Sequence, residues 1–351
     1  MKFGLHYQLP CSSPQSPVQR YRDTLAQATY AEALGFESVW PVEQHFNADL
    51  SILPAPLLLL AALAERTRTL RLGIAIVLLP LSHPLRVAEE IATLDVLSNG
   101  RVEFGIGRGS IPSHFTGFGV PQAESRERFL EGLEVITQAW TRERFSFQGR
   151  FFNVDNLSVV PKPVQQPHPP IRVASNSVDT FELIGQLGYP IFAASQVNPF
   201  FKLKEYIPLY RQARQAAGHP DRGGEEVTLL TPLYVGDSPA QVRQDLEPSI
   251  GHFLQTVAAL YTSHNWGQET GTRRIQEVLE RIRRMTYEQV CEVMAIFDTP
   301  EACVERLKRL QQEFNMGRVI CWFNPGGMVP HDRVMRSMEL FAARVMPQFE
   351  K

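Results

Sequence analysis

Strand-like and helix-like segments alternate along this chain of 351 residues, and the alternation constrains the fold more than any other feature. Eight segments rich in β-branched and aromatic residues are each followed by a helical pattern. Such an order favours parallel strands, and eight units favour a closed (β/α)8 barrel over an open doubly wound sheet. The predicted strands are residues 2–7, 36–42, 70–79, 101–107, 170–175, 190–195, 227–235 and 318–323.

The helical stretches between these strands complete a single predicted domain, residues 1–351. Two stretches interrupt the repeat. The pattern of residues from about 141 to 169 predicts a hairpin and an extended connector after the fourth strand. A second insertion covers about 261–298, near the seventh strand. Because barrel active sites are built from the loops after the strands, each insertion is a candidate lid, and 261–298 is the one we expect to be mobile. The predicted helices are 18–34, 55–66, 85–97, 125–140, 178–187, 200–217, 239–259, 300–314 and 331–345.

Composition excludes several classes of partner. The chain is 44% hydrophobic and has a formal charge of −2, so no long-range field would steer it to nucleic acid or anionic lipid. Its four cysteines show no CxxC spacing, which argues against a zinc site and a disulfide framework. The longest apolar run, 53–64, contains prolines and is too short to cross a membrane. With no signal-peptide pattern at the start, we expect a cytoplasmic protein without a bound metal.

A first polar cluster, Glu43-Gln44-His45, directly follows the second predicted strand. It would lie at the carboxyl end of the barrel, where His45 could exchange a proton near neutral pH and Glu43 could orient it. The alternative is a loop histidine whose hydrogen bonds are satisfied by backbone carbonyls. On residue types alone the two interpretations are equally supported.

A second cluster ends the fourth strand, where Gly105, Gly107 and Gly109 surround Arg108. Glycines let a planar ligand approach the backbone closely, and the arginine offers a fork of donors to a phosphate. A tight turn would explain the glycines but not the arginine. The glycine order does not match a dinucleotide-binding fingerprint, so a Rossmann site is not indicated.

A third polar run, residues 175–180, joins the fifth strand to its helix and contains Asn176, Ser177 and Thr180. Hydroxyls and free N–H groups at a helix N-terminus bind anions, and phosphate is the commonest. Ordinary helix capping is the alternative and is the more frequent use of Ser and Thr. Arg126, at the start of the helix 125–140, could reach the same anion as Arg108 or could pair with a carboxylate on its own helix.

In their order along the chain, these motifs resemble the bacterial luciferase-like monooxygenases, flavin-dependent enzymes built on a (β/α)8 barrel. The resemblance covers nearly the whole chain, and an ordered series of motifs is more specific than any one of them. The matching segments are 2–4, 35–46, 79–86, 94–101, 104–109, 125–126, 337–341 and 345–347.

The resemblance implies a role for each cluster. It places the FMN phosphate at Arg108, Arg126, Ser177 and Thr180, with Asn176 beside them. The flavin ring would pack on the backbone of Ala75, Ile76 and Gly107, with a non-proline cis peptide between Ala75 and Ile76.

Two positions depart from the family pattern. Gln44 stands where the family has the first histidine of a Glu-His-His motif, and Gly107 stands where luciferase has a cysteine near the flavin. Both differences argue against light emission. We therefore assign positioning to Gln44 and any acid-base step to His45, held by Glu43.

The resemblance also implies the reaction and its partners. A separate reductase would supply reduced FMN, which reacts with O2 to oxygenate a small organic substrate. A barrel mouth lined by aromatic residues would suit an apolar substrate, and we expect a homodimer. The alternatives are a hydride-transfer enzyme that uses the deazaflavin F420 on the same fold, and a flavin-binding protein without turnover. The residues expected at the mouth are His6, Tyr7, Phe115, Phe118 and Phe192.

Overall fold

Eight parallel strands close into a barrel in the computed structural model, which describes residues 1–262, 280 and 282–349. Their order around the barrel is β1, β2, β3, β5, β8, β9, β10, β12, and β12 pairs back with β1. The predicted (β/α)8 barrel is thus confirmed, with each predicted strand in place. The strands are β1 (Lys2–Tyr7), β2 (Ser38–Pro41), β3 (Arg71–Gly73), β4 (Val77–Leu78), β5 (Val102–Gly107), β6 (Phe145–Gln148), β7 (Asn153–Leu157), β8 (Ile171–Ala174), β9 (Ile191–Ala194), β10 (Val227–Val235), β11 (Ile296–Asp298) and β12 (Arg318–Trp322).

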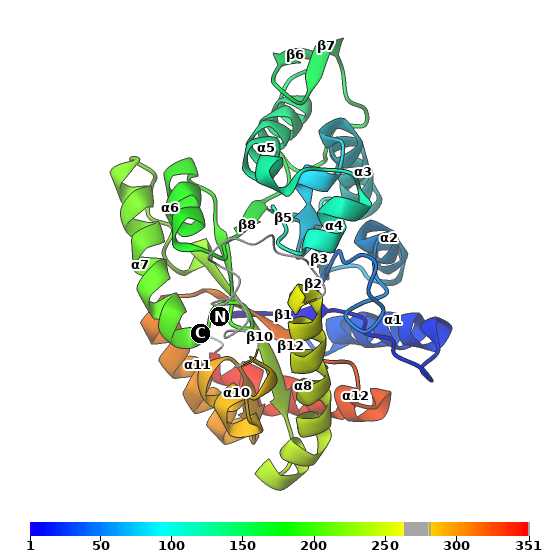
Figure 1. Ribbon diagram of the computed structural model, residues 1–351, viewed down its shortest axis with the longest axis vertical. Coiled ribbons are helices and arrows are strands. Elements are labelled where there is room, and N and C mark those ends of the chain that lie inside the picture. Colours follow the sequence, from blue (N-terminus) through cyan, green and yellow to red (C-terminus); the bar gives the residue numbers. More distant parts are fainter. Residues whose placement is uncertain (263–279, 281, 350–351) are drawn as a thin grey trace.

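Helices surround the barrel and connect its strands, as Figure 1 shows. Several of them begin or end at residues that favour a helix boundary. Ser16 caps α1 and Pro17 follows it, while Gly188 adopts the left-handed conformation that ends α6. The α-helices are α1 (Pro17–Ala33), α2 (Pro56–Arg66), α3 (Pro84–Leu97), α4 (Pro112–Gly117), α5 (Ser125–Thr141), α6 (Val178–Leu187), α7 (Phe200–Ala216), α8 (Pro239–Thr262), α10 (Tyr287–Val293), α11 (Pro300–Phe314) and α12 (His331–Leu340), which continues into a π-helical turn, Phe341–Val345.

The third predicted strand is broken in two. Residues 70–79 were expected to be continuous, but β3 ends at Gly73 and β4 resumes at Val77, with the expected cis peptide between Ala75 and Ile76 in the gap. The neighbouring strand β5 has a glycine beside this break. A Cβ at Gly105 would lie 1.9 Å from the carbonyl oxygen of Ile74, so only glycine fits there.

The barrel interior has a charged floor at the amino ends of the strands. Glu103 accepts from Arg71 at 2.7 Å, from Arg318 at 2.5 Å and from Arg172 at 3.3 Å. Above this network lies a small apolar layer around Trp40, which is fully buried. The layer consists of Trp40, Ala75, Phe192, Leu230 and Ile320. The closed interior is therefore filled, and only the carboxyl ends of the strands are left for a site.

The first insertion forms the predicted antiparallel hairpin, β6 and β7. It follows α5 and so does not belong to a loop after a strand. Glu131 on α5 accepts from the backbone N–H groups of Arg150, Phe151 and Phe152, which fixes the hairpin against that helix. Figure 1 shows the hairpin on the side of α5 that faces away from the barrel strands. The hairpin is therefore not a lid over the pocket end of the barrel, because it packs outside the helix layer.

The second insertion is described only in part. Residues 263–279 and 281 lie outside the described residues, so the expected mobile lid at 261–298 stays a prediction. The end of this insertion contains a helix and a strand that the sequence did not reveal, α10 and β11. Strand β11 pairs in parallel with the C-terminal end of β10, with Leu233 opposite Ile296. Within the described residues, no helix is long and apolar enough to span a membrane.

Candidate active site

A pocket of about 290 Å³ opens where β2, β4, β5 and β8 end. It therefore occupies the face of the barrel at which active sites are built. Seven residues predicted from the sequence line it together: Glu43, Gln44, Ile76, Arg108, Asn176, Ser177 and Thr180. The remaining lining residues are Val42, Leu78, Gly109, Ser110, Ile111, His114, Ala174 and Val197.

One end of the pocket has the features of an anion site. The hydroxyls of Ser177 and Thr180 are 2.9 Å apart, and Arg108 donates to Thr180 Oγ1 over 3.4 Å. Ser177 occupies the N-cap position of α6, yet within the described residues its side chain caps no backbone N–H. Simple capping therefore does not explain its hydroxyl. The N–H of Thr180 already donates to the Ser177 carbonyl oxygen at 2.9 Å, so the N–H groups of Val178 and Asp179 are the ones in the first turn that could donate to a ligand.

Two arginines approach one another at this end of the pocket. Burial lowers the pKa of Arg108, and the nearby charge of Arg126 lowers it further, while Asp179 acts in the opposite direction. Arg126 is exposed and is not among the lining residues. An anion between the two guanidinium groups would replace a repulsion by two attractions.

Another part of the pocket lining is apolar. Ile76 and Leu78 line it from the broken strand, and Ala174 lines it from the end of β8. Ala75 and Gly107 lie beside this wall but do not line the pocket, and a Cβ at Gly107 would fall 2.1 Å from Ile76 Cδ1. The glycine therefore lets Ile76 sit against β5 without intruding on the pocket.

Glu43 and His45 form the predicted pair. His45 Nε2 lies 2.9 Å from Glu43 Oε1, and the backbone N–H of Leu78 donates to Glu43 Oε2 at 2.9 Å. Both carboxylate oxygens are thus engaged, and the pair ties the β2 loop to β4. His45 is not among the lining residues of the pocket, because its ring packs against Phe118 at 4.8 Å and His114 at 5.4 Å.

His114 is a pocket residue that the sequence did not reveal. It belongs to α4, a six-residue helix in the loop after β5, and it is only 2% exposed. Burial lowers its pKa to about 4, with a further contribution from His45. The proline at the start of α4 was the available signal, since Pro112 occupies a first helical position.

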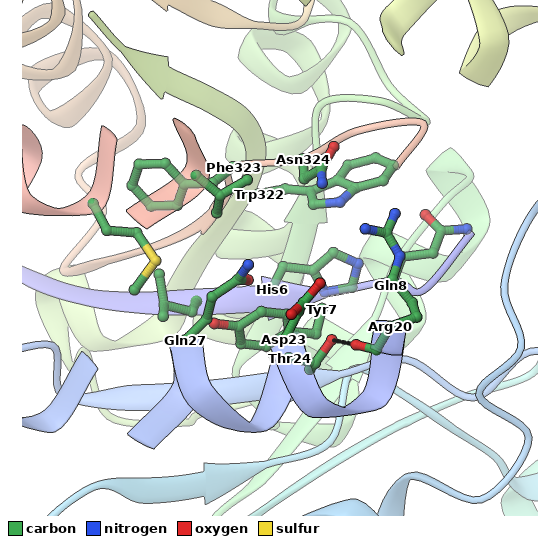
Figure 2. Close-up of a pocket in the computed structure, with 13 residues that line it drawn as sticks. His6, Tyr7, Gln8, Arg20, Asp23, Thr24, Gln27, Trp322, Phe323 and Asn324 are labelled. Carbon is green, nitrogen blue, oxygen red and sulfur yellow. Dashed lines mark hydrogen bonds between the residues drawn. The ribbon is translucent and has the colours of Figure 1, made fainter. Parts of the chain in front are cut away.

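The five residues expected to line the mouth do not line this pocket. Phe192 packs on Trp40 inside the barrel, at 5.0 Å between ring centroids. Tyr7 and His6 instead line a separate cavity of about 30 Å³ between β1, β12 and α1, shown in Figure 2. That volume holds about one water molecule and is too small for a flavin.

A closed (β/α)8 barrel whose pocket combines a candidate anion site with apolar side chains defines a class of small-molecule enzymes, and comparisons with known proteins narrow that class. The family profile of the luciferase-like monooxygenases matches residues 1–314. The chain belongs to this family. It is 28% identical to the alkanal monooxygenase alpha chain of Photorhabdus luminescens, over 99% of this chain and 96% of that one. It is 29% identical to the oxygenase component of the flavin-dependent trigonelline monooxygenase of Acinetobacter baylyi, over 68% and 66%.

Solved structures share the fold over the full length. The monooxygenase RslO1 from Streptomyces bottropensis has a TM-score of 0.86 at 28% identity and is covered completely, as is this chain. The oxygenating constituent of 3,6-diketocamphane monooxygenase from Pseudomonas putida, in complex with FMN, has a TM-score of 0.83 at 20% identity, covering 100% and 99%. An F420-dependent secondary alcohol dehydrogenase has a TM-score of 0.76 at 19% identity, with the same coverage.

Proposed function

We propose that this protein is the oxygenase component of a two-component system that uses reduced FMN and O2 to oxygenate a small, apolar organic molecule. Family membership supports a flavin-dependent monooxygenase. The trigonelline enzyme, named as an oxygenase component, supports a separate source of reduced flavin. The diketocamphane structure, which contains FMN, supports the choice of cofactor.

The observation that carries the proposal is the anion site at the start of α6. Arg108, Ser177 and Thr180 converge there with the free N–H groups of the helix, as a phosphate dianion requires. We assign the 5′-phosphate of FMN to this end, with Arg126 and Asn176 at its edge. Ala75, Ile76 and Gly107 would support the flavin ring, and the apolar side chains of that wall suit the ring's faces.

The chain's own residues would bind, orient and exclude water. Reduced flavin, when bound, supplies the electrons that activate O2. Glu43 holds His45 at 2.9 Å and fixes the orientation of its ring, and we assign His45 any acid-base step. Gln44 lines the pocket and, as an amide, can position a polar atom but cannot exchange a proton at neutral pH.

The direct test compares FMN with riboflavin, which lacks the phosphate. Wild-type protein should bind FMN more tightly, and Arg108→Ala should remove much of that preference. A charge-assisted hydrogen bond contributes about 1.5–3 kcal/mol, or roughly ten- to a hundredfold in affinity. Arg336→Ala is the matched control, because Arg336 is an exposed arginine on α12. Unchanged FMN affinity in Arg108→Ala would refute the phosphate assignment.

Binding and turnover measurements also test the two alternative functions, an F420-dependent enzyme and a flavin-binding protein without turnover. F420 also carries a phosphate, and the alcohol dehydrogenase with this fold binds it. Tight binding of F420 with negligible binding of FMN would favour hydride transfer. Binding of FMN without O2 consumption, tested with a flavin reductase and a panel of apolar substrates, would favour a flavin-binding protein without turnover.

We also propose a homodimer in which α2 contributes to the interface. Leu58 on this helix is 75% exposed, and Ala62 follows it one turn later on the exposed face. In a two-fold symmetric dimer, the same face of α2 on a second copy would bury this leucine. Leu58→Lys should then shift the mass measured by light scattering from dimer to monomer. A monomeric wild-type protein would contradict the proposal.

A further inference from the structure

The pocket wall contains a buried acceptor that lacks a partner. Oε1 of Gln44 is inaccessible to solvent and accepts no hydrogen bond from the part of the chain that the structure describes. A buried polar atom without a partner is unfavourable unless a ligand supplies one. Because Gln44 lines the pocket, rotation of its terminal amide would turn Oε1 toward a bound ligand, which could then supply the missing donor.

The same wall contains a buried donor. The backbone N–H of His45 donates to Nε2 of His114 over 3.4 Å, so a neutral His114 ring carries its proton on Nδ1. Burial and the neighbouring His45 hold the pKa of His114 at about 4, which keeps the ring neutral at physiological pH. The other charged or titratable groups at this pocket are Glu43, whose oxygens are both engaged, and Arg108 at the phosphate end.

We propose that Gln44 and His114 form an uncharged acceptor and donor pair that recognises the edge of the flavin ring where an N–H group lies between two carbonyls. This inference rests on the proposed function, since it requires a flavin in the pocket. Gln44 Oε1 would accept from the ring N–H, and His114 Nδ1–H would donate to a carbonyl oxygen. An aliphatic ligand would leave both groups unpaired, whereas this edge satisfies them together.

The pair also accounts for the glutamine at position 44. A histidine there could take up a proton, but the neutral amide offers an acceptor at every pH. The imidazole at this wall comes from α4 instead, where His114 is shielded from solvent and held by the backbone of the β2 loop. These are positioning and specificity roles, distinct from the acid-base role proposed for His45.

The test uses FMN and 3-methyl-FMN, in which a methyl group replaces the ring N–H proton. Affinities are measured by fluorescence titration for the wild type and for Gln44→Leu. The wild type should prefer FMN by about tenfold, the loss of one hydrogen bond, and Gln44→Leu should bind the two flavins equally. If Gln44→Leu kept the wild-type preference, the methyl group would act by steric exclusion and the proposal would be overturned.

His114 is tested with two substitutions and a control. His114→Phe should weaken FMN binding about tenfold and change the visible absorption band of the bound flavin, whereas His114→Gln, which can both accept and donate, should restore much of both. His219→Gln, in the loop before β10, should match the wild type. Wild-type affinity and spectrum in His114→Phe would overturn the role of His114. A wild-type protein with no preference for FMN over riboflavin would refute the proposed function, whereas that preference without discrimination against 3-methyl-FMN would overturn only this inference.

Discussion

Single residues at the pocket divide into those that residue type could identify and those that it could not. Arg108, Ser177 and Thr180 were predicted because a phosphate needs charge and oriented donors at a helix N-terminus, and the structure brings all three to one pocket. His114 was missed because its importance depends on α4, a helix of six residues with little periodic signal. Tyr7 was placed at the mouth but lies in the separate cavity beside α1.

At this scale the clearest prediction concerns His45. Since His45 is paired with Glu43 and proton transfer typically contributes 10²- to 10⁴-fold, His45→Ala should lose about two orders of magnitude in kcat or more, with little change in FMN affinity. Gln44→Ala should lose less. Steady-state oxygenation of a working substrate gives kcat, and titration gives affinity. Full activity in His45→Ala would assign the pair a structural role in joining the β2 loop to β4.

Helices and strands with a long, regular hydrophobic pattern were predicted well. Elements whose limits depend on packing against a neighbour were predicted poorly. Strand β10 and helices α6 and α11 begin and end as expected, because each has a sustained pattern with clear stop signals. The interruption between β3 and β4 has no such signal, since residues 72–79 are apolar throughout. That interruption depends on its neighbour β5, where Gly105 leaves room for the Ile74 carbonyl.

Gly105→Ala should therefore be strongly destabilising. Its Cβ would meet backbone that cannot rotate away, and overpacking of this kind costs about 1–3 kcal/mol or more. Gly251→Ala is the matched control, because a Cβ there meets nothing within 4 Å and alanine in the helix α8 should gain up to about 1 kcal/mol. Urea unfolding measures both. Equal stability of Gly105→Ala and wild type would mean that β5 can move away from the break.

The whole molecule is a barrel whose two ends serve different purposes. The carboxyl ends of the strands form the pocket, and the amino ends close around Glu103. Burial alone would raise the pKa of Glu103, but Arg318, Arg172 and Arg71 outweigh it and lower the pKa to about 2. The alternation of strands and helices predicted the barrel, whereas the floor could not be foreseen because its members come from strands distant in the sequence.

The floor predicts acid sensitivity. Because the folded pKa of Glu103 lies below the unfolded value near 4.5, its contribution of about 3 kcal/mol is present above pH 4.5 and is lost as the pH falls toward 2. Glu103→Gln should be less stable at pH 7, since it removes the buried carboxylate that Arg71, Arg172 and Arg318 share, and should change less between pH 5 and 3. Glu247→Gln, in an exposed helical pair, should behave as the wild type. An unaltered pH profile in Glu103→Gln would contradict this account.

The central claim is that the pocket holds reduced FMN and presents it to O2. Its most direct measurement is an anaerobic titration of the protein with reduced FMN and, separately, with reduced F420, followed by rapid mixing of each complex with O2. We predict saturable binding of reduced FMN that Arg108→Ala weakens, and a rate of flavin oxidation by O2 that differs from that of free flavin. Binding of reduced F420 alone, or oxidation of FMN at the same rate with and without protein, would contradict the claim.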